Sequence, residues 1–207
     1  MVSKLNIGQF SELANYLKQV KPKVSNFLVF NPGHEWRETV DVTFGGRYSD
    51  YQKPIHQAID ILEPEVTVNV RFYPLCFMKG YEKNNSNFPQ QGYDPYEWSF
   101  YQKRETCEDE IRDLYIRGKK MNIYHEEEEE IPYNALALKQ GYEQCLKSEK
   151  CFACSCRNIC SGFPYNYIKR FGFGEEKPFT GGLVKDPLCF RRQDAKNRIY
   201  DSESEKY

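Results

Sequence analysis

The chain has 207 residues, with 29 Lys and Arg against 30 Asp and Glu and a formal net charge of -1. A chain of this length can bury a hydrophobic core without disulfides, and its balanced charge gives no electrostatic basis for binding nucleic acid or an anionic membrane. The first twenty residues lack the features of a secretory signal, and no run of about 18 apolar residues follows. We therefore expect a cytoplasmic protein with reduced cysteines and with neither nucleic acid nor membrane as a partner.

Helical and strand periodicities alternate in the first third of the chain. Apolar residues recur at helical spacing over residues 8–20 and again over 48–62, and Asn6 and Gln9 have the spacing of a capping box. Two runs rich in branched and aromatic residues, 24–32 and 66–74, read as strands. Alternating helices and strands with these connections predict parallel α/β units.

The second predicted strand has one apolar and one polar face. Val66, Val68, Val70 and Phe72 alternate with polar residues. If the sheet curls into a barrel, the valine face packs on helices, and Asn69, Arg71 and Tyr73 face a polar lumen.

The middle of the chain gives weaker signals. Residues 73–98 are rich in Tyr, Asn, Gln, Gly and Pro, which is typical of a long functional connection, and the stretch 81–98 is a candidate substrate loop. Residues 105–117 and 133–147 are expected to be helices, and the acidic run 125–130 is expected to be a solvated face.

Four cysteines lie within ten residues, in the spacing C-x2-C-x-C-x3-C: Cys151, Cys154, Cys156 and Cys160. The spacing differs from that of bacterial ferredoxins in its middle gap, and no second Cys or His pair follows as in a zinc finger. Without Cys156 the pattern is C-x2-C-x5-C, which supplies three thiolates and leaves a four-coordinate centre one ligand short. Thiolate suits iron-sulfur clusters and zinc equally, so ligand type leaves the metal open.

Four segments in this order resemble the C-terminal half of a radical S-adenosylmethionine (SAM) enzyme with an auxiliary iron-sulfur domain of the SPASM or twitch type. They are "FLVFNPGHEW", "VNVRFYPLCFMKGYE", "YDPYEW" and "KCFACSCRNICSGFPYNYIKRFGFGEEKPF". The likeness covers roughly residues 6 to 190, and the C-x2-C-x5-C element is its most specific part.

The resemblance implies that the two strands are the last strands of a partial (β/α)6 barrel. It makes Cys76, just beyond the second strand, the candidate fourth ligand of a 4Fe-4S cluster held by Cys151, Cys154 and Cys160. A loop leaving a strand at the carboxyl end of a barrel is where sites assemble, which agrees with this position. The alternative for Cys76 is a small buried apolar residue.

Further candidate site residues accompany this resemblance. Asn31, Arg71 and Tyr73 are candidate cofactor-binding residues, and Arg71 could clamp a carboxylate or pair with an acidic neighbour. Cys156 and Cys145 are possible additional ligands. No catalytic residue is assigned: His34 beside Glu35 could transfer protons, but a structural role is more common for such a loop histidine.

The chain departs from the family in one decisive respect. It has no C-x3-C-x2-C motif, which in the family holds the cluster that reduces SAM. The second 4Fe-4S cluster and SAM are therefore expected only in a complete enzyme, and this chain is not expected to be catalytically competent alone. It reads as a truncated enzyme or as a subunit whose partner supplies the N-terminal half-barrel, acting on an unknown substrate.

The predicted organisation is a barrel part at 1–75, a connecting region at 76–132, an auxiliary iron-sulfur domain at 133–190 and a tail at 191–207. The alternative function is a non-enzymatic zinc-binding interaction module. Its ligands would be Cys151, Cys154 and Cys160 with either Cys156 or Cys145.

Overall fold

The computed structural model describes residues 1–30, 44–93 and 145–191. The predicted helices at 105–117 and over most of 133–147 lie outside these ranges, as do the acidic run 125–130, Asn31, His34 and Glu35.

The N-terminal part is a parallel βαβ unit with a preceding helix. The elements are a 3-10 turn η1 (Ile7–Gln9), α1 (Phe10–Val20), β1 (Val24–Leu28), α3 (Tyr48–Leu62) and β2 (Thr67–Arg71). Strands β1 and β2 pair in parallel, with Val24 opposite Thr67 and Leu28 opposite Arg71. The predicted helices and parallel strands are confirmed: α3 has the predicted bounds, and the other three elements are shorter than predicted. The predicted capping box is wrong, because the Asn6 side chain accepts a hydrogen bond from the Ser3 amide instead.

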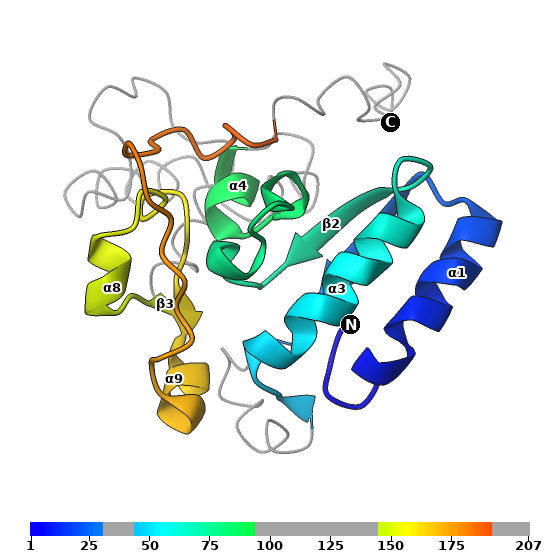
Figure 1. The fold of residues 1–207 in the computed structure, drawn as a ribbon, viewed down its shortest axis with the longest axis horizontal. Coiled ribbons are helices and arrows are strands. Elements are labelled where there is room, and N and C mark those ends of the chain that lie inside the picture. Colours follow the sequence, from blue (N-terminus) through cyan, green and yellow to red (C-terminus); the bar gives the residue numbers. More distant parts are fainter. Residues whose placement is uncertain (31–43, 94–144, 192–207) are drawn as a thin grey trace, which may run out of the picture.

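Helices α1 and α3 pack against each other, and Figure 1 shows them side by side, with β2 next to α3. The buried side of α3 carries Tyr48, Tyr51, Ile55, Ile59 and Leu62, which recur every three or four residues. Val68 and Val70 of β2 are likewise buried. The βαβ unit agrees with α/β character, while a (β/α)6 barrel would need strands beyond those described and stays a prediction.

After β2 the chain forms short turns, η2 (Leu75–Phe77) and η3 (Glu82–Asn84), and helix α4 (Phe88–Tyr93). The polar side chains of this region are mostly buried, and they form hydrogen bonds with main-chain groups. The Asn84 amide donates to the Val68 carbonyl at 3.0 Å, and the Tyr73 N–H donates to Asn87 Oδ1 at 3.0 Å. Within residues 81–91, the asparagine-rich composition therefore serves packing at the carboxyl end of β2.

The cysteine-rich part contains β3 (Cys145–Leu146), α8 (Glu149–Phe152), β4 (Phe163–Pro164) and α9 (Tyr165–Phe171). Strands β3 and β4 are antiparallel. The helix expected to run to residue 147 is therefore wrong at its end, because Cys145 and Leu146 pair with β4.

An aromatic cluster joins the two parts. The rings of Tyr48 and Tyr167 stack at 4.0 Å, and the Tyr48 N–H donates to the Tyr167 hydroxyl at 2.9 Å. The cysteine-rich segment thus packs at the carboxyl end of β2, on the left of Figure 1.

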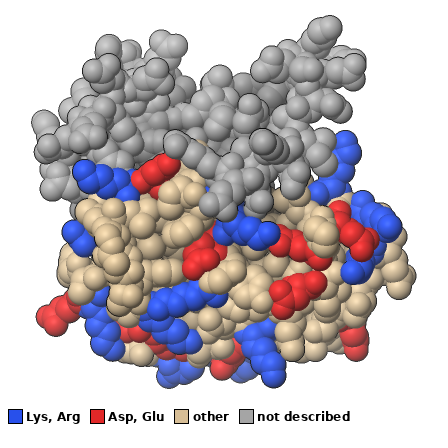
Figure 2. Space-filling model, turned by 45° about the horizontal axis from the view of Figure 1, so that its top comes forward, with Lys and Arg blue, Asp and Glu red and all other residues tan. Residues whose placement is uncertain are grey.

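Charged side chains of both signs are interspersed over the described part of the face in Figure 2. Among the described residues, no helix has the length and apolar character required to cross a membrane.

Candidate metal centre

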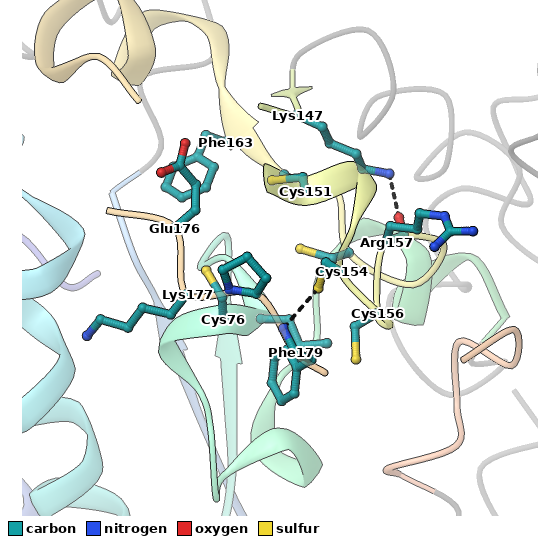
Figure 3. Close-up of a pocket in the computed structure, with 14 residues that line it drawn as sticks. Cys76, Lys147, Cys151, Cys154, Cys156, Arg157, Phe163, Glu176, Lys177 and Phe179 are labelled. Atoms are coloured by element: carbon teal, nitrogen blue, oxygen red, sulfur yellow. Dashed lines mark hydrogen bonds between the residues drawn. The ribbon is translucent and has the colours of Figure 1, made fainter. Parts of the chain in front are cut away.

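Five cysteine side chains line one cavity of about 380 Å³ that is partly open to solvent: Cys76, Cys151, Cys154, Cys156 and Cys160. Cys76 comes from η2, directly after β2, and the others come from α8 and the turns that lead to β4 (Figure 3). The fold therefore brings Cys76 to a cluster of cysteines 75 or more residues further along the chain.

Backbone N–H groups point at three of these sulfurs. The Phe179 amide donates to Cys154 Sγ at 3.2 Å (Figure 3). Backbone hydrogen bonds from Lys177 to Cys76, and from Leu75 and Gly162 to Cys160, lower the pKa values of those two thiols. Such donors favour thiolate over thiol, and hydrogen bonds to ligating sulfurs also tune iron-sulfur clusters.

Burial outweighs these donors while no metal is bound. It raises the pKa of Cys76 to about 12, and the neighbouring Cys160, Cys151 and Cys154 add to the increase. Burial likewise raises the pKa of Cys160. Raised pKa values are expected where several thiols share one buried cavity, because the negative thiolates would repel one another. A bound cation would reverse the effect, since thiols that coordinate a metal are deprotonated.

Cys156 and Cys145 differ from the other four. Figure 3 shows the Cys156 side chain pointing away from Cys76 and Cys151. Its Sγ contacts the Ser155 hydroxyl at 3.9 Å, and burial raises its pKa to about 12. Cys145 lies in β3 and lines a separate cavity of about 220 Å³. The geometry thus separates Cys156 and Cys145 from the predicted set.

Within the described ranges, no three His, Cys, Asp or Glu side chains are grouped so that they could hold a single metal ion. The thiols instead stand around a cavity. Two separate segments of the chain therefore contribute thiols to one cavity.

Of the predicted lumen residues, Arg71 and Tyr73 lie in the core, while Asn69 is half-buried. Arg71 is buried at the end of β2. Tyr73 is also fully buried, and its hydroxyl donates to the Tyr48 carbonyl at 2.6 Å. The strand alternation stops at Phe72, whose φ of 59° turns the chain, so Tyr73 packs on α3. Asn31, the third candidate, lies outside the described residues.

Residues 175–179 lie within the predicted auxiliary domain, but none of them was predicted to border the site. This segment supplies the Lys177 and Phe179 backbone donors, and Glu176, Lys177, Pro178 and Phe179 line the cavity. Backbone donors carry no residue-type signature, and the pair Glu175 and Glu176 is common at protein surfaces. The position of this segment beside the cavity depends on the tertiary fold.

The chain was compared with protein-family models, with curated proteins and with solved structures. None of them matches it.

Proposed function

We propose that this chain binds an iron-sulfur cluster through Cys76, Cys151, Cys154 and Cys160 and serves as the auxiliary-cluster part of a radical SAM enzyme. The observation that carries the proposal is the common cavity, to which η2 contributes one thiol and the 151–160 segment contributes the others. In a reducing cytosol structural disulfides are rare, so thiols that share a cavity are expected to stay reduced and to bind metal.

The choice of iron-sulfur over zinc rests on the shared cavity and on the sulfur environment. A structural zinc site needs four ligands converging at about 2.0 to 2.3 Å from one ion. The thiols here surround a cavity, and Cys76, Cys154 and Cys160 each accept backbone N–H donors. Both features support the cluster.

The radical SAM assignment rests on the resemblance and on the parallel βαβ unit whose second strand leads into the site. An auxiliary cluster supplies electron relay or holds substrate when bound. The chain's own contribution would be to bind the cluster in this cavity, to direct backbone donors at its ligands and to cover the carboxyl end of β2. Radical generation would require a C-x3-C-x2-C segment, which these 207 residues do not contain.

Anaerobic reconstitution with iron and sulfide tests the proposal. We expect a brown protein with charge-transfer absorption near about 400 nm and about four irons per chain. A colourless protein that instead retains one zinc would contradict the proposal and support the zinc-binding module.

A further inference from the structure

Two backbone donors of the site come from one short segment: the Lys177 amide donates to Cys76, and the Phe179 amide donates to Cys154. A backbone donor stays on its sulfur only while the main chain around it is held in place. Hydrogen bonds to ligating sulfurs shift the reduction potential of an iron-sulfur cluster. The contacts that hold this segment therefore bear on the chemistry of the site.

Gln52, in α3, links this segment to the turn that carries Cys76. Its Oε1 accepts a hydrogen bond from Lys177 Nζ at 2.8 Å, and its Nε2 donates to the Phe77 carbonyl at 3.1 Å. Phe77 directly follows Cys76 in η2, and Figure 3 shows the Lys177 side chain extending away from the cysteines. One neutral amide group thus joins the residue that donates to Cys76 with the residue next to Cys76.

The surroundings of Gln52 keep its amide in position. Helix α3 is anchored in the core by its buried apolar side. One turn further along it, His56 Nε2 donates to the same Phe77 carbonyl at 2.9 Å, and the Lys177 ammonium lies 5.6 Å from the centroid of the Phe77 ring. A glutamine amide carries an acceptor and two donors on one planar group, so it can bridge an ammonium and a carbonyl. Gln52 therefore transmits the fixed position of α3 to the donor segment.

We infer that Gln52 is a positioning residue that sets the reduction potential of the bound cluster by holding the Lys177 and Phe179 amides on their sulfurs. The inference rests on the proposed function, since only a bound redox-active group has a potential to set. Amide donors stabilise the reduced cluster more than the oxidised one, because the reduced form carries the larger negative charge. Displacing these donors therefore makes the potential more negative.

The inference is tested by a mediated redox titration of the reconstituted protein, followed by electron paramagnetic resonance. Gln52→Leu removes both hydrogen bonds without changing the charge, and Gln57→Leu makes the same substitution at an exposed position of the same helix. At the midpoint potential of the wild type, we expect the ratio of reduced to oxidised cluster to fall at least about threefold in Gln52→Leu, which corresponds to about 28 mV for one electron. The ratio should be unchanged in Gln57→Leu.

Iron content and far-UV circular dichroism of each protein are measured first. A wild-type protein that binds no cluster overturns both proposals. Equal midpoint potentials in loaded wild type and Gln52→Leu overturn the role of Gln52 and leave the cluster assignment intact, as does an equal shift in Gln57→Leu. If Gln52→Leu does not fold or load iron, Gln52→Asn replaces it, because its amide is one methylene too short to reach both partners. An unchanged potential in Gln52→Asn then overturns the inference.

Discussion

At the scale of single residues, the candidate site differs from an ordinary group of buried cysteines in what surrounds its sulfurs. Backbone amides from Lys177 and Phe179 reach Cys76 and Cys154 from one short segment. Pro178 stands between them and has no N–H to leave unsatisfied. The segment therefore donates from the first and third of three consecutive residues, and the middle residue has no N–H group.

Proton competition should govern metal loading. Burial raises the pKa of Cys76 to about 12, so this thiol is protonated at neutral pH and must release its proton to bind metal. Affinity therefore rises with pH throughout the range below that pKa, by about tenfold per pH unit for each proton released. Iron or zinc titrations at pH 6.5, 7.5 and 8.5 measure the slope, and a pH-independent affinity would contradict the assignment of buried thiols as ligands.

The sequence predicted part of the site at this scale. Cys151, Cys154 and Cys160 follow from their spacing, and Cys76 follows from the resemblance and from its place after a strand. Glu176 and the backbone donors could not be predicted, because they depend on how the 175–179 segment folds back over the cavity. Tyr73 was expected on the polar face, and the turn at Phe72 changes its direction.

At the scale of elements, the closure of β3 on β4 depends on Gly162. This residue has a φ of +92°, and a Cβ added to it would lie 2.3 Å from the Leu146 carbonyl oxygen. The main chain of β3 would have to move to make room, and Cys160 and Phe163 lie on either side of the glycine. The close approach of the Gly162 and Leu146 main chains thus requires a glycine at the start of β4.

Replacing this glycine should cost more than its backbone conformation alone. We expect Gly162→Ala to lower the free energy of unfolding by about 3 kcal/mol or more, from strain together with the clash. Gly80→Ala is the matched control, since Gly80 has a φ of +84° with nothing within 4 Å, and it should cost about 1 kcal/mol. Urea denaturation compares them, and equal losses would show that the approach to Leu146 is unimportant.

Helix α3 is tied to η2 by a histidine. The His56 Nε2 group donates to the Phe77 carbonyl at 2.9 Å, and burial lowers the His56 pKa below its usual 6.5. The folded state therefore favours neutral His56, and its contribution to stability is lost as pH falls from about 6.5 through the folded pKa. Thermal unfolding between pH 5 and 8 should show stability rising with pH, with a shallower slope in His56→Gln. An unchanged slope in that variant would assign the effect to other groups.

The elements themselves were the most predictable level of the structure. The apolar stripes of α1 and α3 and the alternation in β2 each require one backbone geometry, so their periodicity predicted them. Strand β3 was not predicted, because two residues are too short for a pattern and its partner β4 lies eighteen residues along the chain. The polar composition of 73–93 gave no sign that its asparagines would be buried.

At the scale of the whole molecule, the cavity lies where the βαβ unit meets the cysteine-rich segment. Contacts across this junction include Gln90 Nε2 to the Ile159 carbonyl at 2.7 Å and Lys79 Nζ to the Pro178 carbonyl at 2.9 Å. A metal group bound by Cys76 and by the 151–160 segment would cross-link the same junction.

Metal removal should therefore destabilise both parts together. Because binding to the folded state alone adds to its stability, we expect chelation to lower the unfolding temperature by about 10 °C or more. Differential scanning calorimetry of loaded and metal-free protein measures the change. A metal-dependent shift confined to a small separate transition would indicate a site within the cysteine-rich segment alone.

The most direct test of the account is the iron content of two variants after anaerobic reconstitution and desalting. We predict that Cys76→Ala loses most of its iron and its absorption near about 400 nm, while Cys156→Ala, which removes a thiol pointing away from Cys76 and Cys151, retains both. Full iron content in Cys76→Ala would contradict the claim that the cluster joins η2 to the cysteine-rich segment.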